Sequence, residues 1–233
     1  MVKIQVIEKL FLHILTFSFL LIPLTYLFFR SKRRSELIIV VYGILFFFLL
    51  YLINPDHRYI PKPYLQIYQT FYTFCEYLFF TYLLFQNITI NKFKIIILTF
   101  TVLFISFLIY DYSINKVNKL DSIPVGIETI LIFIYISFFF YQNFKNTNEE
   151  YIYIQPCFWV SIGMLIYLGG TFFFNILVNH IDKTQVAKYW YLTYIADIIK
   201  NLLFCISIIV SVRSYHKEKL PHKSVPHLDL DMN

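Results

Sequence analysis

The chain has 233 residues, of which 58% are hydrophobic, and it contains 27 Phe and 20 Tyr. Only 15% of the residues are charged, whereas an ordinary soluble domain has about 25%. These proportions exclude a disordered chain, a collagen-like chain and an ordinary soluble domain. They indicate a polytopic helical membrane protein.

A transmembrane helix needs about 20 mainly apolar residues, and stretches of roughly this length use nearly the whole chain. The pattern predicts an all-α, seven-helix transmembrane bundle over residues 1–212 and a flexible cytoplasmic tail over 213–233. Pro23 lies inside the first predicted segment, so we expect a kink there. The predicted segments are Leu10–Phe29, Leu37–Ile53, Gln66–Phe85, Phe93–Tyr110, Val125–Tyr141, Pro156–Val178 and Tyr191–Val212.

The basic residues predict the orientation of the bundle. Eleven Lys and Arg residues fall on the side of the first loop and eight on the other side, with Lys200 inside the membrane. The first loop is the densest of these groups, and early short loops weigh most in setting topology. We therefore expect an outside N-terminus and a cytoplasmic C-terminus in a bacterial inner membrane. The net charge of +6 then serves topology and contact with the lipid bilayer rather than a nucleic acid.

The third predicted segment carries a polar stripe. Gln69, Thr73 and Glu76 are spaced by four and three residues, which places them on one face of a helix. Intramembrane carboxylates are costly and usually face the bundle interior. The stripe is either the lining of a cavity or proton path, or a structural seam of hydrogen bonds between helices.

The seventh predicted segment carries an intramembrane pair of opposite charges. Asp197 and Lys200 are three residues apart, so they share a helix face and can pair, with Asn201 beside them. The pair is either a structural lock or part of a ligand or proton site completed by Glu76. Two carboxylates and one lysine would form a network with a negative charge or a shared proton, able to respond to pH or to a cation.

Glu128 is the fourth ionisable residue within the predicted segments. It lies about one turn into the fifth segment, after Ser122 and Pro124. A carboxylate near a helix N-terminus is favoured by the helix dipole, and we expect that structural role for it before a role in the site.

No motif of a known catalytic or metal centre is present in the sequence. We therefore expect no metal and do not favour an enzyme. A lysine in the seventh helix resembles the Schiff-base lysine of retinal proteins. The microbial members place an acid four residues before it, whereas Asp197 lies three before Lys200, so we expect neither retinal nor any other cofactor.

The C-terminal two-thirds of the chain resembles a group of small, uncharacterised seven-helix bacterial membrane proteins. The resemblance rests on four stretches of sequence: Pro156–Val160, Tyr167–Phe173, Trp190, and Asp197–Phe204. Ser122–Pro124 with Glu128, and the region of Glu76, are also similar. Such proteins are often encoded beside sensor histidine kinases, which implies a sensory role. The resemblance assigns no functional residue.

Together these observations favour a membrane receptor or sensor that passes a signal to a cytoplasmic partner. A signalling kinase, cytoplasmic or in the membrane, is the expected protein partner, and a small molecule is the expected ligand. The alternatives are a proton- or ion-coupled transporter, an intramembrane enzyme acting on lipid, and a retinal-type pigment. The candidate polar core consists of Glu76, Asp197, Lys200, Gln69, Thr73, Asn201 and Glu128.

Overall fold

The computed structural model describes residues 2–29, 34–53, 64–114, 122–145, 152–177 and 191–219. Within these ranges the chain is all-α, with seven α-helices, one short 3-10 helix and no strand. The α-helices are α1 (Val2–Phe29), α2 (Arg34–Ile53), α3 (Leu65–Asn87), α4 (Asn91–Ile114), α5 (Ser122–Lys145), α6 (Pro156–Leu177) and α8 (Tyr191–Lys219). The 3-10 helix η3 (Ile152–Ile154) precedes α6.

The seven predicted segments coincide with the seven α-helices, and most of the helices are longer than predicted. The fifth segment was expected to begin at Val125, but α5 begins at Ser122. The tail was expected to begin at Arg213, whereas α8 continues to Lys219. Hydropathy marks only the apolar part of a helix, so polar turns at either end are missed. Residues 220–233 lie outside the described ranges.

Four helices contain stretches long and apolar enough to cross a membrane, namely Lys9–Phe29, Asn91–Ser113, Ile123–Lys145 and Tyr191–Ser214. Shorter apolar stretches occur in α2 over Glu36–Leu52 and in α6 over Pro156–Phe172. Helix α3 carries several Gln, Thr and Tyr residues and Glu76 within its 23 residues, which lowers its hydropathy. The chain is therefore a helical membrane protein by length and composition.

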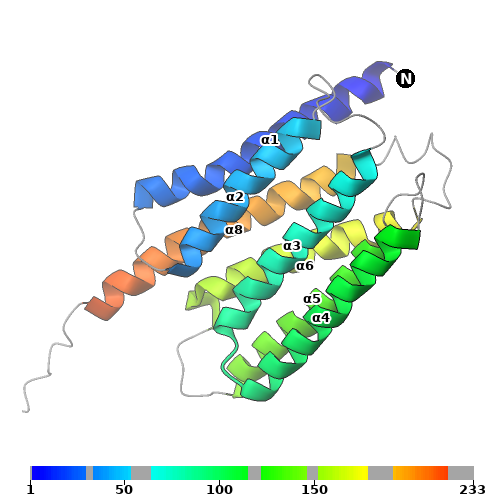
Figure 1. The fold of residues 1–233 in the computed structure, drawn as a ribbon. Coiled ribbons are helices and arrows are strands. Elements are labelled where there is room, and N and C mark those ends of the chain that lie inside the picture. The colour runs from blue at the N-terminus through cyan, green and yellow to red at the C-terminus, as the bar shows by residue number, and fades with distance from the viewer. Residues whose placement is uncertain are drawn as a thin grey trace, which may run out of the picture.

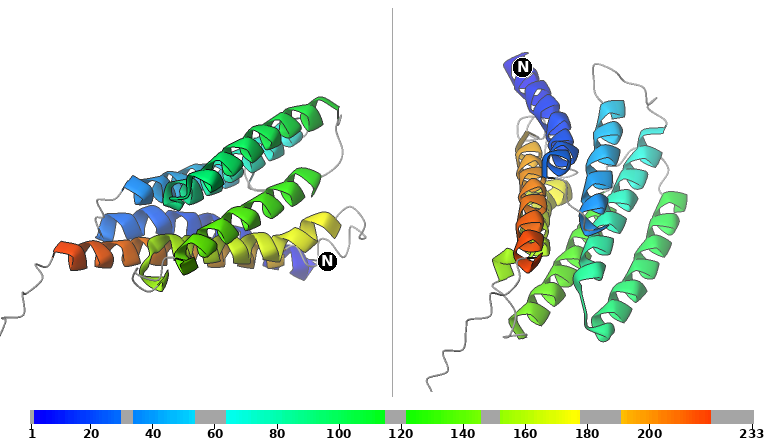
Figure 2. Two further views of the ribbon diagram at one scale, coloured as in Figure 1. Left: turned by 90° about the horizontal axis from the view of Figure 1, so that it is seen from below. Right: turned by 90° about the vertical axis from the view of Figure 1, so that its left-hand side faces the viewer.

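The helices form two layers, which are seen edge-on in Figure 2 and face-on in Figure 1. One layer contains α1, α8, α6 and α5, in which α8 packs between α1 and α6. The other contains α2, α3 and α4. Helix α3 contacts α5 and α6, and α2 contacts α1, so these pairs join the layers.

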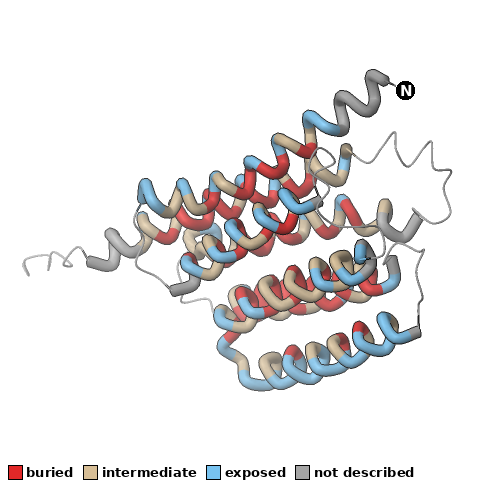
Figure 3. The backbone as a smooth tube through the Cα atoms, turned by 45° about the horizontal axis from the view of Figure 1, so that its top comes forward, coloured by how far each residue is buried: buried red, intermediate tan, exposed pale blue. Residues whose placement is uncertain are grey.

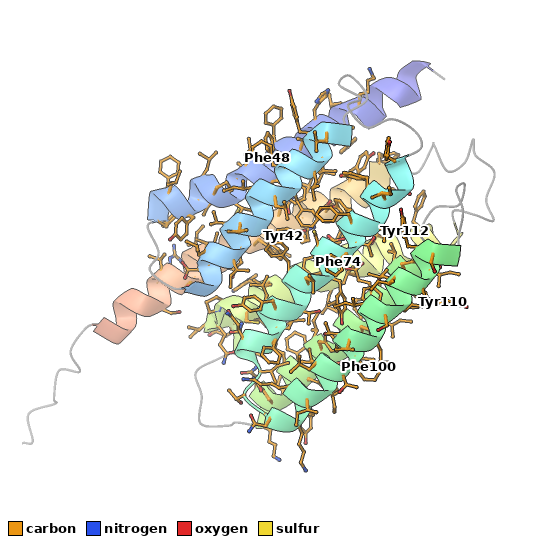
Figure 4. The ribbon with its side chains drawn as sticks, in the orientation of Figure 1. Tyr42, Phe48, Phe74, Phe100, Tyr110 and Tyr112 are labelled. Carbon is orange, nitrogen blue, oxygen red and sulfur yellow. The ribbon has the colours of Figure 1, made fainter. Side chains whose placement is uncertain are left out.

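The outer surface of the bundle is apolar, as lipid contact requires. Only 17% of the apolar stretch of α4 is buried, and its exposed side chains include Ile95, Val102 and Ile109. Figure 3 shows the exposed residues on the outward faces of the helices and the buried ones between the layers. Phe48 and Tyr110, labelled in Figure 4, are 59% and 64% exposed.

Small residues allow the closest helix contacts. A Cβ atom added at Gly43 of α2 would lie 3.0 Å from the Phe19 carbonyl oxygen of α1. Pro23 has no N–H to donate to that carbonyl, and α1 nevertheless runs unbroken through Pro23. A Cβ atom added at Gly170 of α6 would lie 3.0 Å from the Cβ atom of Ala196 in α8. These contacts place α2 against α1, and α6 against α8, the helix that carries Asp197 and Lys200.

Candidate functional site

Lys200 lies inside α8, and its side chain is completely buried. Its Nζ atom is 2.5 Å from Oδ1 of Asp197, one turn earlier in the same helix. It is also 3.6 Å from Oε1 of Glu76 on α3. A hydrogen bond of 2.6 Å runs from Nζ to the hydroxyl of Tyr42 on α2. Residues of both layers therefore hold one buried cation.

Four aromatic rings surround the same ammonium group. The ring centroid of Tyr167 lies 3.9 Å from Nζ, and that of Tyr42 lies 5.1 Å away. The centroids of Phe19 and Phe80 lie at 5.4 and 5.7 Å. A cation within about 6 Å of a ring centroid is attracted to the negative face of the ring. The rings come from four different helices and compensate part of the hydration that the ammonium loses on burial.

Glu76 accepts hydrogen bonds from two of these tyrosines. The Tyr42 hydroxyl donates to Oε1 at 3.3 Å, and the Tyr167 hydroxyl of α6 donates to Oε2 at 3.0 Å. Each carboxylate oxygen thus has a donor, as a buried charge requires. We call Glu76, Asp197, Lys200, Tyr42 and Tyr167 the Lys200 cluster. Figure 4 labels Tyr42 on α2.

The structure brings together the three charged residues singled out in the sequence. Asp197 and Lys200 pair as their spacing predicts, and Glu76 of the other layer completes the group. Asn201 is also fully buried, and its Nδ2 atom donates to Oγ of Ser18 on α1 at 2.8 Å. Asn201 therefore links α8 to α1 beside the cluster, and its Oδ1 atom has no hydrogen-bond partner among the described residues.

The two other residues of the predicted stripe on α3 differ in their environment. Thr73 is buried, at 4% exposure, one turn before Glu76. Gln69 is only half-buried, and no hydrogen bond joins it to the cluster in the described part of the chain. The charged end of the stripe belongs to the site, and Gln69 lies nearer the helix end.

Glu128 occupies a different place from the one expected. Because α5 begins at Ser122, Glu128 lies nearly two turns into the helix, beyond the first turn where the helix dipole acts. It is 1% exposed and interacts electrostatically with Glu76 and Lys200. Its Oε1 atom has no hydrogen-bond partner among the described residues. The expectation of a helix-end role is wrong, and Glu128 instead interacts electrostatically with two members of the Lys200 cluster.

Sequence reasoning missed the aromatic members of the site. Tyr42, Tyr167, Phe19 and Phe80 are four of 47 Phe and Tyr residues, and nothing in their spacing separates them from the others. It also missed Glu36, which is 1% exposed in the first turn of α2. The second helix was predicted to begin at Leu37, so Glu36 was assigned to a loop, whereas α2 begins at Arg34.

On the described part of the bundle, open grooves on the outside include the following two. The larger, of about 680 Å³, lies between α1 and α8 and includes His13 and Ser18 among apolar side chains. The other, of about 390 Å³, lies between α3 and α4 and includes Phe74 and Tyr112, both labelled in Figure 4. Ser18 connects the first groove to Asn201 and hence to the neighbourhood of Lys200.

Within the described ranges, no three His, Cys, Asp or Glu side chains are grouped so as to hold a metal ion. Hydroxyl, carboxylate and ammonium groups form a continuous chain from Glu76 through Tyr42 to Lys200 and Asp197. Such a chain can hold or pass a proton without any other group. Comparison with family models, with curated proteins and with solved structures finds no match to this chain.

Proposed function

We propose that the chain is a seven-span protein of a bacterial inner membrane, with its N-terminus outside, that senses a signal and passes it to a signalling kinase. The observation that carries this proposal is the position of the Lys200 cluster between two helix layers. Two of its three charged residues lie on α8, which continues past the end of its apolar stretch at Ser214 to Lys219.

This arrangement suits signalling because a charge change at Lys200 alters the contacts between the layers. Small changes at a site are amplified when packed elements have two arrangements, and rigid helices carry such shifts over a distance. Helix α8 extends from the cluster to the side that we expect to be cytoplasmic. Near its C-terminal end α8 is also bonded to η3, which precedes α6, because Ser214 donates to the Ile154 carbonyl at 3.2 Å.

The test measures whether the cluster controls the end of α8. Spin labels are attached at Lys145→Cys and Arg213→Cys, two exposed positions at the ends of α5 and α8, after replacement of the native cysteines. In nanodiscs, Asp197→Asn or Lys200→Met should shift the distance distribution between the labels. The exposed Lys92→Met is the matched control. An unchanged distribution in both cluster variants, each shown to be folded, contradicts the proposal.

A second experiment separates sensing from the other functions. A proton flux into proteoliposomes that Glu76→Gln abolishes would favour a proton-coupled carrier over a sensor. Turnover of bilayer lipid by the same vesicles would favour an enzyme, and visible absorbance after addition of retinal would favour a pigment. The sensor proposal expects none of these three signals.

The seven spans and their orientation have a direct test. Single cysteines are placed at Ser31, in the first loop, and at Asp56, in the second, in a chain without Cys75, Cys157 and Cys205. In intact cells, a membrane-impermeant thiol reagent should label the cysteine at 56 and spare the one at 31. The reverse pattern would invert the orientation, and equal labelling would mean that the intervening helix does not cross.

A further inference from the structure

We propose that Glu128 is a proton-binding site and that the proton it holds is the signal to which the Lys200 cluster responds. Two buried carboxylates, those of Glu76 and Asp197, lie within 3.6 Å of the Lys200 ammonium group. A third, that of Glu128, is 1% exposed on α5, which packs against α3, and it interacts electrostatically with Glu76 and Lys200. If all were ionised, this group would carry two negative charges without a cation. A buried charge without a partner is strongly destabilising, so we expect the group to bind a proton. The one negative charge that then remains lies on Glu76 and Asp197, where Tyr42 and Tyr167 donate hydrogen bonds to Glu76.

The contacts identify Glu128 as the residue that holds this proton. Asp197 forms an ion pair with Lys200 at 2.5 Å. Glu76 lies 3.6 Å from the same ammonium and accepts a bond from Tyr42 at Oε1 and from Tyr167 at Oε2. Glu76 therefore has a donor at each oxygen, whereas Asp197 has the ammonium group of Lys200 at Oδ1 and no other hydrogen-bond partner there among the described residues.

One oxygen of Glu128 lacks any hydrogen bond of this kind within the described part of the chain. Its Oε1 atom has no hydrogen-bond donor among the described residues, and it is as buried as the others. The charged groups that interact with it are Glu76 of α3 and Lys200 of α8, and the ammonium of Lys200 is already paired with Asp197. The other ionisable groups on the described helices that pack against α5 are Tyr68, Tyr72, Cys75, Tyr77 and Tyr82 of α3, Cys157 and Tyr167 of α6, and Lys92, Lys94, Tyr110, Asp111 and Tyr112 of α4.

The protonation state of Glu128 should affect how the two helix layers pack at the Lys200 cluster. Loss of the Glu128 proton adds a buried negative charge that interacts electrostatically with Glu76, and it should repel the carboxylate that holds α3 against Lys200. The contacts between α3 and α8 should therefore weaken as the pH rises. This inference rests on the proposed sensor function only in calling the proton a signal, because the binding of the proton is a property of the cluster itself.

The test uses the full chain in lipid nanodiscs without any partner. The infrared band of a protonated carboxylic acid should be present at neutral pH and lost in Glu128→Gln. Because the folded state would bind one more proton than the unfolded state, the folded fraction should fall as pH rises, by up to about tenfold in the equilibrium constant per pH unit. Glu128→Gln should remove this dependence. Glu36→Gln, at an equally buried acid in the first turn of α2, should retain it.

The two proposals fail in different ways. A wild-type protein without the carboxylic acid band, or a Glu128→Gln variant with the wild-type pH profile, overturns the proton site. A pH profile that changes with sodium or potassium concentration would mean that a cation, and not a proton, balances the charge. If the band and profile are as expected but the labels on α5 and α8 do not move with pH, the proton site stands and the sensor function fails.

Discussion

Tyr167 contacts both charges of the buried site, because its ring lies 3.9 Å from the Lys200 ammonium and its hydroxyl donates to Glu76 at 3.0 Å. One side chain of α6 thus stabilises a cation of its own layer and an anion of the other. The two contacts can be separated by substitution.

Tyr167→Phe should keep the ring over the ammonium and remove the hydrogen bond to Glu76. A hydrogen bond to a charged group contributes about 1.5–3 kcal/mol, so we expect a loss of that size in the free energy of unfolding. Tyr167→Leu should cost more, since the cation–π contact is lost as well. Tyr141→Phe, at a 55% exposed tyrosine, is the control. Equal stability of Tyr167→Phe and wild type in a detergent unfolding assay would contradict the bond.

Lys200→Met should be the most destabilising single change in the cluster. It leaves Asp197 and Glu76 buried without their cation, and breaking a buried ion pair costs about 3–5 kcal/mol. Adding Asp197→Asn and Glu76→Gln should restore part of the loss, because the uncompensated charges are then gone. The unfolding midpoints of the single and triple variants measure this. A triple variant no more stable than Lys200→Met would argue against charge compensation.

Gly170→Ala should disturb the site, whereas Gly169→Ala should not. A Cβ atom at Gly170 would meet Ala196 at 3.0 Å, next to Asp197, and overpacking of this kind costs about 1–3 kcal/mol. At Gly169 the nearest atom is the Phe133 ring at 3.8 Å, which is ordinary contact. Thermal unfolding of the two neighbouring variants gives a matched comparison. Equal midpoints would mean that α6 and α8 can separate without cost.

Asn201 and Ser18 should behave as a coupled pair. Ser18→Ala removes the acceptor of the Asn201 amide and leaves a buried donor unpaired, which costs about 1–3 kcal/mol. The double variant with Asn201→Leu removes both polar groups and should recover most of this loss. A double-mutant cycle on unfolding free energies measures the coupling. Strictly additive effects would show that the bond contributes nothing.

Much of the fold follows from the sequence, because apolar length alone marks each helix. The charged core also follows, since Asp197, Lys200 and Glu76 are rare residues in apolar segments and the spacing of the first two predicts their pairing. The aromatic cage does not follow. Tyr42 and Tyr167 are selected by which helices are neighbours, and this depends on tertiary packing through positions such as Gly43.

The environment of Glu128 could not be predicted from the sequence either. Its distance from the helix start depends on whether α5 begins at Ser122 or at Val125, and three residues decide whether the helix dipole reaches it. Its distance from Glu76 depends on the packing of α5 against α3. A helix boundary and a helix pairing are the two properties that one sequence determines least well.

The position of α8 between α1 and α6 has a consequence for biosynthesis. The ribosome makes α8 after the six other described helices, yet it fills the middle of its layer. Until it inserts, Glu76 and Tyr42 have no cation to surround, and α1 and α6 have no shared neighbour. A nascent chain released before Tyr191 should therefore remain open along this gap. Such a chain should be open to the quality-control proteases of the membrane. The described bundle is complete only when α8 inserts and supplies Lys200.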